Sequence, residues 1–85
     1  MRLNLKQDEL IDELFNKVKS KYPEIIKLNL WENPDDHEHI LINVLAPMEE
    51  EREMEMMSYT AVVKSDIHLK YGYLISILPE NPNLL

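Results

Sequence analysis

The sequence predicts an α+β fold of the order α-β-β-α-β, in which two helices pack on a mixed three-stranded sheet. Residues 4–22 and 47–70 repeat apolar side chains at helical spacing. Residues 24–31, 39–45 and 73–78 have the length and the apolar pattern of strands. The second helix joins two of these strands, and such a crossover places its strands parallel in one sheet.

The first predicted helix begins at Asn4, whose side chain can cap the free amides while Gln7 completes a capping box. It ends at Tyr22-Pro23, because a proline cannot continue a helix. One apolar stripe predicts a single buried face, made of Leu10, Ile11, Leu14, Phe15 and Val18.

The three predicted strands differ in the faces that they bury. Strict alternation in the first strand predicts an apolar face of Ile26, Leu28 and Leu30 and a mixed face of Ile25, Lys27, Asn29 and Trp31. The second strand is apolar on both faces, so we expect it in the centre of the sheet. A short turn-forming stretch, Glu32 to Asp36, favours an antiparallel pair. The third strand sets Tyr73, Ile75 and Ile77 opposite Leu74, Ser76 and Leu78.

The long second helix is predicted to start at Pro47 and to end before Gly72, the only glycine. It has two apolar faces. The face with Ser58, Ala61 and Ser65 is predicted to pack on the sheet, because small residues permit close approach. The other face is the predicted interface for a second copy or a partner protein, and it consists of Met56, Tyr59, Val63 and Ile67.

Length and composition limit the class of protein. The 85 residues allow one domain, predicted to span 1–78, followed by an extended tail, 79–85. A net charge of −7 repels phosphate backbones and argues against nucleic acid as a partner. There is no cysteine, and no apolar run reaches the roughly 20 residues that span a bilayer. These features, with no secretory pattern at the amino terminus, predict a cytoplasmic protein without a membrane partner.

The densest polar cluster, Asp35 to His39, is the candidate for a metal site. Asp35, His37 and His39 could hold zinc or another divalent cation, although a solvent-exposed turn has the same composition. No nucleophile elbow and no glycine-rich phosphate loop occurs, so we predict no catalytic residue and no other cofactor. Asn29 and Asn43 interrupt apolar strands, and we expect them to hydrogen-bond across strands or to line a cleft.

The order of the patterns resembles the minimal nucleotidyltransferase domain. The segment LIDELFNKVKSKYPEIIKLNLW is followed by HILINVLAP, a long charged helix and LKYGYLISILP. The resemblance implies a nucleotidyltransferase-like fold. In that family a Gly-Ser motif follows the first strand, and two aspartates, two apart, begin the second strand and bind magnesium and a nucleotide triphosphate.

This chain departs from the family at both motifs. Trp31-Glu32-Asn33-Pro34 stands at the first, and either His37 with His39 or Glu38 with Ile40 stands at the second. Neither pair supplies two carboxylates for two-metal phosphoryl transfer. The resemblance therefore implies an inactive member, of a family whose members often act with a helical partner as toxin and antitoxin.

The sequence thus predicts a small non-catalytic interaction domain that self-associates or binds a protein partner through the apolar helix face. The alternative is a metal- or nucleotide-binding, nucleotidyltransferase-like enzyme that uses the Asp35 to His39 loop. A third hypothesis is that the glutamates at the start of the second helix bind a basic partner, which predicts salt-dependent association.

Overall fold

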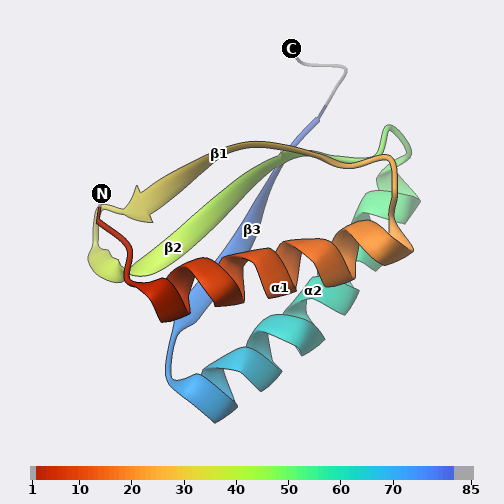
Figure 1. The fold of residues 1–85 in the computed structure, drawn as a ribbon. Helices are drawn as coiled ribbons and strands as arrows, with labels where there is room; N and C mark the ends of the chain where they lie inside the picture. Colours follow the sequence, from red (N-terminus) through yellow and green to blue (C-terminus); the bar gives the residue numbers. More distant parts are fainter. Residues whose placement is uncertain (1, 82–85) are drawn as a thin grey trace.

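The computed structural model describes residues 2–81 and contains two helices and one three-stranded mixed sheet (Figure 1). The elements in chain order are α1 (Leu5–Lys21), β1 (Ile26–Asn33), β2 (Asp36–Leu45), α2 (Glu50–Tyr71) and β3 (Leu74–Glu80). The predicted α+β fold and its α-β-β-α-β order are confirmed. Within the described residues, neither helix combines the length and the apolar character that crossing a membrane requires.

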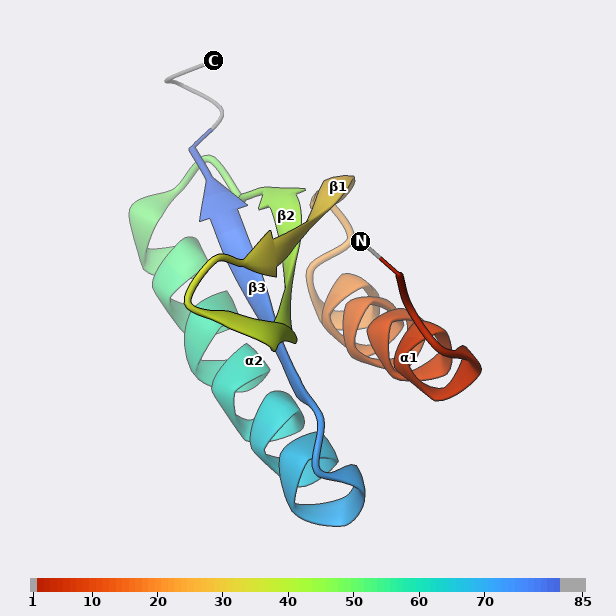
Figure 2. The same ribbon diagram turned by 90° about the vertical axis from the view of Figure 1, so that its left-hand side faces the viewer.

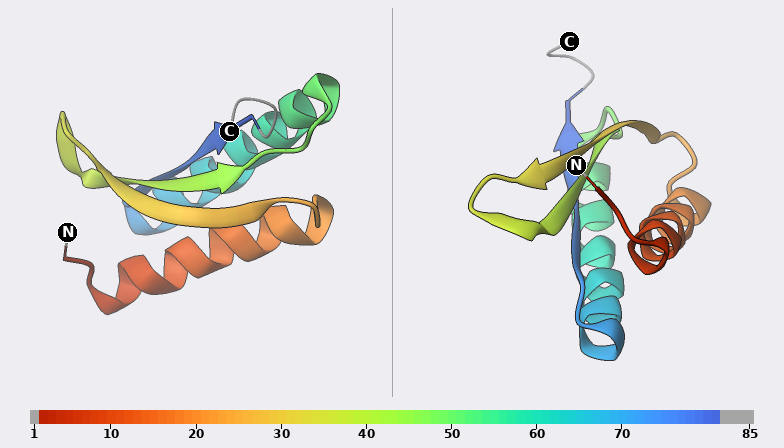
Figure 3. Two further views of the ribbon diagram at one scale, coloured as in Figure 1. Left: turned by 90° about the horizontal axis from the view of Figure 1, so that it is seen from above. Right: turned by 60° about the vertical axis from the view of Figure 1, so that its left-hand side comes forward.

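The sheet has β2 in the centre, between β1 and β3, as the view from above in Figure 3 shows. β1 and β2 are antiparallel and are joined by a tight turn at Pro34 and Asp35. β3 pairs with β2 in parallel, because α2 returns the chain to the end of the sheet at which β2 begins. Both predicted pairings and the central position of the second strand are therefore confirmed.

Both helices lie on one side of the sheet, below the strands in Figure 1, and Figure 2 shows α2 running alongside β3. The core between the two layers takes apolar side chains from both helices and from the helix-facing side of β2 and β3. Its buried members are Leu10, Ile11, Leu14, Val18, Tyr22, Ile25, Ile40, Ile42, Val44, Met56, Val63, Ile67, Ile75 and Ile77. The opposite side of the sheet is not covered by any helix or strand of residues 2–81.

The start of α1 agrees with the prediction. Asn4 Oδ1 accepts a hydrogen bond from the Gln7 N–H at 2.7 Å, and Gln7 Oε1 accepts one from the Asn4 N–H at 3.0 Å. This reciprocal capping box satisfies two amide donors at the helix end. Gly72, with φ of 77°, ends α2 in the left-handed conformation that glycine adopts without strain.

The start of α2 is later than predicted, at Glu50 and not at Pro47. The Ala46 N–H donates to the Glu80 carbonyl at 2.8 Å, so the pairing of β2 with β3 extends past Leu45. The chain must leave the sheet before it can turn, and residues 47–49 make that turn.

The two faces of α2 are the reverse of the prediction. Ser58, Ala61 and Ser65, which were predicted to pack on the sheet, are exposed. The buried residues of the helix are Met56, Thr60, Val63 and Ile67. Their spacing makes one straight helical stripe, which the polar Thr60 interrupts in the sequence pattern. The Thr60 hydroxyl donates to the Met56 carbonyl at 2.8 Å, so it is satisfied inside the helix and can enter the core.

β1 does not alternate strictly, because a register shift between Lys27 and Asn29 forms a β-bulge. Lys27 pairs with Val44, and after the bulge Leu30 pairs with Ile42. Both therefore lie on the helix side. The predicted apolar face that groups Ile26 with Leu30 is wrong, since the bulge puts Ile26, Asn29 and Trp31 together on the other side.

β3 extends beyond the predicted end of the domain at residue 78. Pro79 pairs with Val44 and Glu80 pairs with Leu45, so these positions belong to the sheet and not to the predicted tail, 79–85. Proline is tolerated here because β3 is an edge strand. Positions 82–85 of the predicted tail lie outside the described residues.

Candidate functional site

The register defines a surface that we name the open face, which is the side of the sheet opposite the helices. Three rows of side chains cross it from β1 to β3: Trp31, Leu41 and Ser76; Asn29, Asn43 and Leu78; and Ile26, Leu45 and Glu80. His39 and Leu74 form a shorter row at the beginning of β2 and β3. Alternation sets these side chains opposite the helix-facing residues Ile40, Ile42 and Val44.

Large apolar side chains remain exposed on the open face. Ile26 and Trp31 are each 52% exposed, and Leu74 and Leu78 are exposed as well. Leu41 and Leu45, on the central strand, are half-buried. Scattered apolar residues are ordinary on a protein surface, whereas a contiguous group bordered by polar residues marks an interaction site.

Asn43 lies at the centre of the open face but is only 2% exposed. Its Nδ2 donates to Glu80 Oε1 at 2.8 Å, so its hydrogen bond does not go to Asn29, although these two asparagines lie opposite each other in register. Asn43 Oδ1 is buried and has no hydrogen-bond partner among residues 2–81. Such a buried acceptor costs about 1–3 kcal/mol of stability.

A second polar group on the open face connects α2 with the β1–β2 turn. Lys64 Nζ donates to Ser76 Oγ at 3.2 Å, and Ser76 Oγ lies 2.8 Å from His39 Nε2. His39 Nδ1 lies 3.2 Å from Asn33 Nδ2, and Asn33 Oδ1 accepts from the Asp35 N–H at 2.9 Å.

These contacts decide whether Ser76 and His39 could act as a nucleophile and its base. Because Asn33 Oδ1 accepts from the Asp35 N–H, the orientation of the Asn33 side-chain amide is fixed, and Asn33 Nδ2 donates to His39 Nδ1. The proton of neutral His39 is then on Nε2, which donates to Ser76 Oγ. A general base must instead accept the serine proton at that nitrogen. The pair is therefore arranged to hold the strands and not to activate Ser76.

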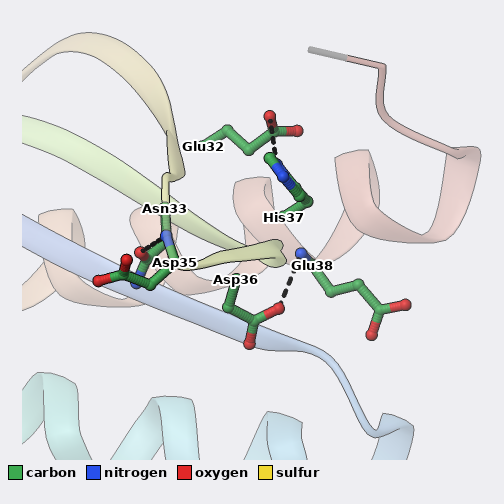
Figure 4. Close-up of polar contacts among 6 residues, drawn as sticks. All are labelled: Glu32, Asn33, Asp35, Asp36, His37 and Glu38. Carbon is green, nitrogen blue, oxygen red and sulfur yellow. Dashed lines mark hydrogen bonds and ion pairs between the residues drawn. The ribbon is translucent and has the colours of Figure 1, made fainter.

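The predicted metal ligands Asp35, His37 and His39 do not converge. His37 Nδ1 lies 3.1 Å from Glu32 Oε2, and Figure 4 shows this pair turned away from the carboxylates of Asp35 and Asp36. His39 contacts Asn33 and Ser76 instead. No group of three His, Asp or Glu side chains within residues 2–81 could hold a metal ion, so the predicted site is wrong for this part of the chain.

The predicted interface on α2 is wrong as well. Met56 is 0% exposed, and Val63 and Ile67 are buried, so these side chains cannot contact a partner. Tyr59 is half-buried, and its ring centroid lies 6.3 Å from that of Tyr22. The physical reason is that α1 packs against this stripe, so the two helices and the sheet share a single core.

A charged cluster holds the end of α1 to the start of α2. Arg52 forms a salt bridge with Glu24, and its guanidinium carbon lies 4.7 Å from the Tyr22 ring centroid. The hydrogen bond from Arg52 lowers the pKa of the Glu24 carboxyl below its ordinary value of 4.5. The same bond raises the pKa of Arg52. Both side chains are well exposed, so this contact positions the helices and forms no site.

A polar pocket of about 380 Å³ lies where the starts of α1, β2 and β3 meet. Arg2 and His37 line it together with Asp36 and Glu38, and Asn4 Nδ2 donates to Tyr73 Oη at 3.2 Å in its wall. The lining combines the Arg2 guanidinium with the Asp36 and Glu38 carboxylates, so the pocket does not present charge of a single sign.

Comparisons of the chain with protein-family models, with curated proteins and with solved structures found no match. The resemblance to the nucleotidyltransferase domain therefore stays a prediction from the order of the sequence patterns.

Sequence reasoning overlooked the open face, although one signal for it was present. The second strand is apolar on both faces, while both helices lie on one side of the sheet. Trp31 and Leu78 then lie on a surface that nothing in residues 2–81 covers.

Proposed function

We propose that this protein is a small interaction domain, without a catalytic role, that binds another protein through the open face. The observation that carries the proposal is the set of exposed large apolar side chains on this one face, Ile26, Trp31, Leu74 and Leu78. Burial of apolar surface is the dominant favourable term in protein association. A partner that covers this face would complete a second layer on the sheet.

Charge favours a different protein over a second copy of the chain. Each copy has a net charge of −7, so two copies repel each other before they meet. A second copy would also bring another Glu80 carboxylate to the contact. The resemblance to nucleotidyltransferase-like members of toxin and antitoxin pairs supplies one setting for such a domain, on the strength of the sequence pattern alone.

Site-specific photo-crosslinking in the native cell tests the proposal. A benzophenone amino acid replaces Trp31 on the open face in one variant and Val62 on the outer side of α2 in the other, because both positions are well exposed. We expect a discrete crosslinked complex with another protein from position 31 only. Leu78→Lys should abolish it, because a charge then lies in the apolar contact.

The control for Leu78→Lys is Leu69→Lys, which adds the same charge at an exposed leucine of α2 and should leave the complex intact. A crosslinked product of two copies of the chain would contradict the choice of partner. Equal crosslinking from positions 31 and 62, or none from position 31, would overturn the open face as the binding surface.

A further inference from the structure

The open face has the dimensions of a single α-helix. Its three strands, spaced about 4.8 Å apart, are about 10 Å wide between the outer two, and a helix with its side chains is about 10–12 Å across. The rows from His39 to Leu45 extend about 20 Å along β2. A helix of about 13 residues has the same length.

The edges of the sheet are less suited to an added strand. The bulge between Lys27 and Asn29 interrupts the free edge of β1, and a bulge is a device that blocks strand addition. At the other edge, Lys64 reaches from α2 past β3 to Ser76 on the open face. A ligand that lies on the face is therefore favoured over one that extends the sheet.

The polar centre of the open face carries a negative charge. The Glu80 carboxylate is half-buried, and Asn43 Nδ2 donates to its Oε1 at 2.8 Å. Asn43 Oδ1 is itself buried, so a ligand on this face meets the carboxylate and not the amide oxygen. Lys64 reaches this face from α2, and its ammonium is directed to Ser76. A cationic side chain from outside can therefore pair with the Glu80 carboxylate.

We infer that the occupant of the open face is an amphipathic helix of the partner protein that presents a lysine or arginine to the Glu80 carboxylate. Its apolar side covers Trp31, Leu41 and Leu78, and its cationic side chain pairs with Glu80, which the hydrogen bond from Asn43 holds in place. The net charge of −7 attracts such a basic segment from a distance. This inference rests on the proposed function, because it names the chemistry of the partner at the same surface.

Fluorescence titration with synthetic helices tests the inference. One peptide of about 14 residues carries leucine at helical spacing and lysine elsewhere, and its matched analogue carries glutamine in place of lysine. Neither contains tryptophan, so the emission of Trp31, the only tryptophan of the chain, reports binding at the open face. We expect the lysine peptide to bind at least about tenfold more tightly than the glutamine peptide.

A pair of charge-matched variants separates local recognition from general attraction. Glu80→Gln keeps an acceptor for Asn43 Nδ2 but removes the charge, and should weaken the lysine peptide about tenfold without affecting the glutamine peptide. Glu51→Gln removes the same charge at an exposed position of α2 and should change the affinity less than about twofold. Thermal unfolding of both variants confirms that each remains folded.

The outcomes distinguish this inference from the proposed function. Equal weakening by Glu80→Gln and Glu51→Gln, or equal affinity of the two peptides, would overturn the cationic contact while the open face remained the binding surface. Binding that leaves Trp31 emission unchanged and is insensitive to Leu78→Lys would overturn both. Binding of neither peptide would overturn the helical occupant. The crosslinking experiment alone would then test whether the open face is the binding surface.

Discussion

The two faces of the sheet carry similar apolar side chains but leave them in different states. On the helix side, Ile40, Ile42 and Val44 are buried beneath α1 and α2. On the open face, Ile26, Trp31 and Leu78 remain in contact with solvent. Even on the central strand β2, Leu41 and Leu45 of the open face are only half-buried, so the difference comes from the two helices, which cover one side only.

The buried polar groups of the two faces differ in whether their hydrogen bonds are satisfied. Thr60, the polar residue of α2 within the core, satisfies its hydroxyl on its own helix. Asn43, on the open face, is as deeply buried and leaves Oδ1 without a partner among residues 2–81. The helix side is thus packed within one molecule, whereas the open face keeps apolar side chains in solvent.

Two neighbouring valines of α2 provide the strongest test of which face of this helix lies in the core. Val63 is 6% exposed and Val62 is 61% exposed. Val63→Asp buries an unpaired charge in the core and should cost about 3–5 kcal/mol or prevent folding. Val62→Asp adds the same charge in solvent and should change stability by less than about 0.5 kcal/mol. Urea unfolding followed by circular dichroism measures both stabilities. A larger loss for Val62→Asp would show that Val62, and not Val63, lies on the core side of α2.

A matched pair of isoleucines compares the two faces of the sheet directly. Ile42 is 0% exposed on the helix side, and Ile42→Ala should cost about 2–5 kcal/mol, because it leaves a cavity. Ile26 lies half in solvent on the open face, so Ile26→Ala should cost less than about 1 kcal/mol. In the crosslinking assay the ranking should reverse: Ile26→Ala weakens the complex, whereas any folded Ile42→Ala protein keeps it. Similar stability losses in the two variants would show that the open face is packed in the monomer.

The parts of the fold that could be predicted from sequence are those that depend on local pattern. Asn4 and Gln7 cap α1, as their spacing indicates, and Gly72 ends α2. The short link between Trp31 and His39 required an antiparallel pair, and the helical crossover required a parallel one. In each case the nearby residues determine the geometry.

The errors arose where a residue behaves differently in the folded chain from its usual preference. Ser58, Ala61 and Ser65 are small but exposed, so the prediction that small residues mark the sheet-packing face placed the interface on the wrong side of α2. The bulge after Lys27 moved Ile26 to the side of Trp31. Side-chain hydrogen bonds to Glu32 and Ser76 separate His37 from His39, and no local pattern predicts such long-range contacts.

The open face should show a conflict between stability and binding at Asn43. Asn43→Leu removes the buried acceptor without a partner and keeps a similar volume, at the cost of the hydrogen bond to Glu80. Unfolding should show a stability that is unchanged within about 1 kcal/mol or raised, because the two contributions oppose each other. The same variant should bind the lysine peptide more weakly, because Glu80 loses the hydrogen bond that holds its carboxylate in place. A loss of well over 1 kcal/mol would instead show that Asn43 stabilises the monomer.

The smallest expected effect is that of the exposed salt bridge between Glu24 and Arg52, which holds the end of α1 to the start of α2. The pKa of Glu24 is lowered by Arg52, so the contact stabilises the fold above the ordinary carboxyl pKa of 4.5 and is lost as the pH falls through the lower folded value. Glu24→Gln should therefore be slightly less stable than the parent at neutral pH and equal to it in acid. Urea unfolding between neutral and acidic pH measures this difference, which added salt should reduce, because the pair is exposed. A difference that persisted unchanged in acid would mean that the Glu24 charge does not contribute to holding α1 to α2.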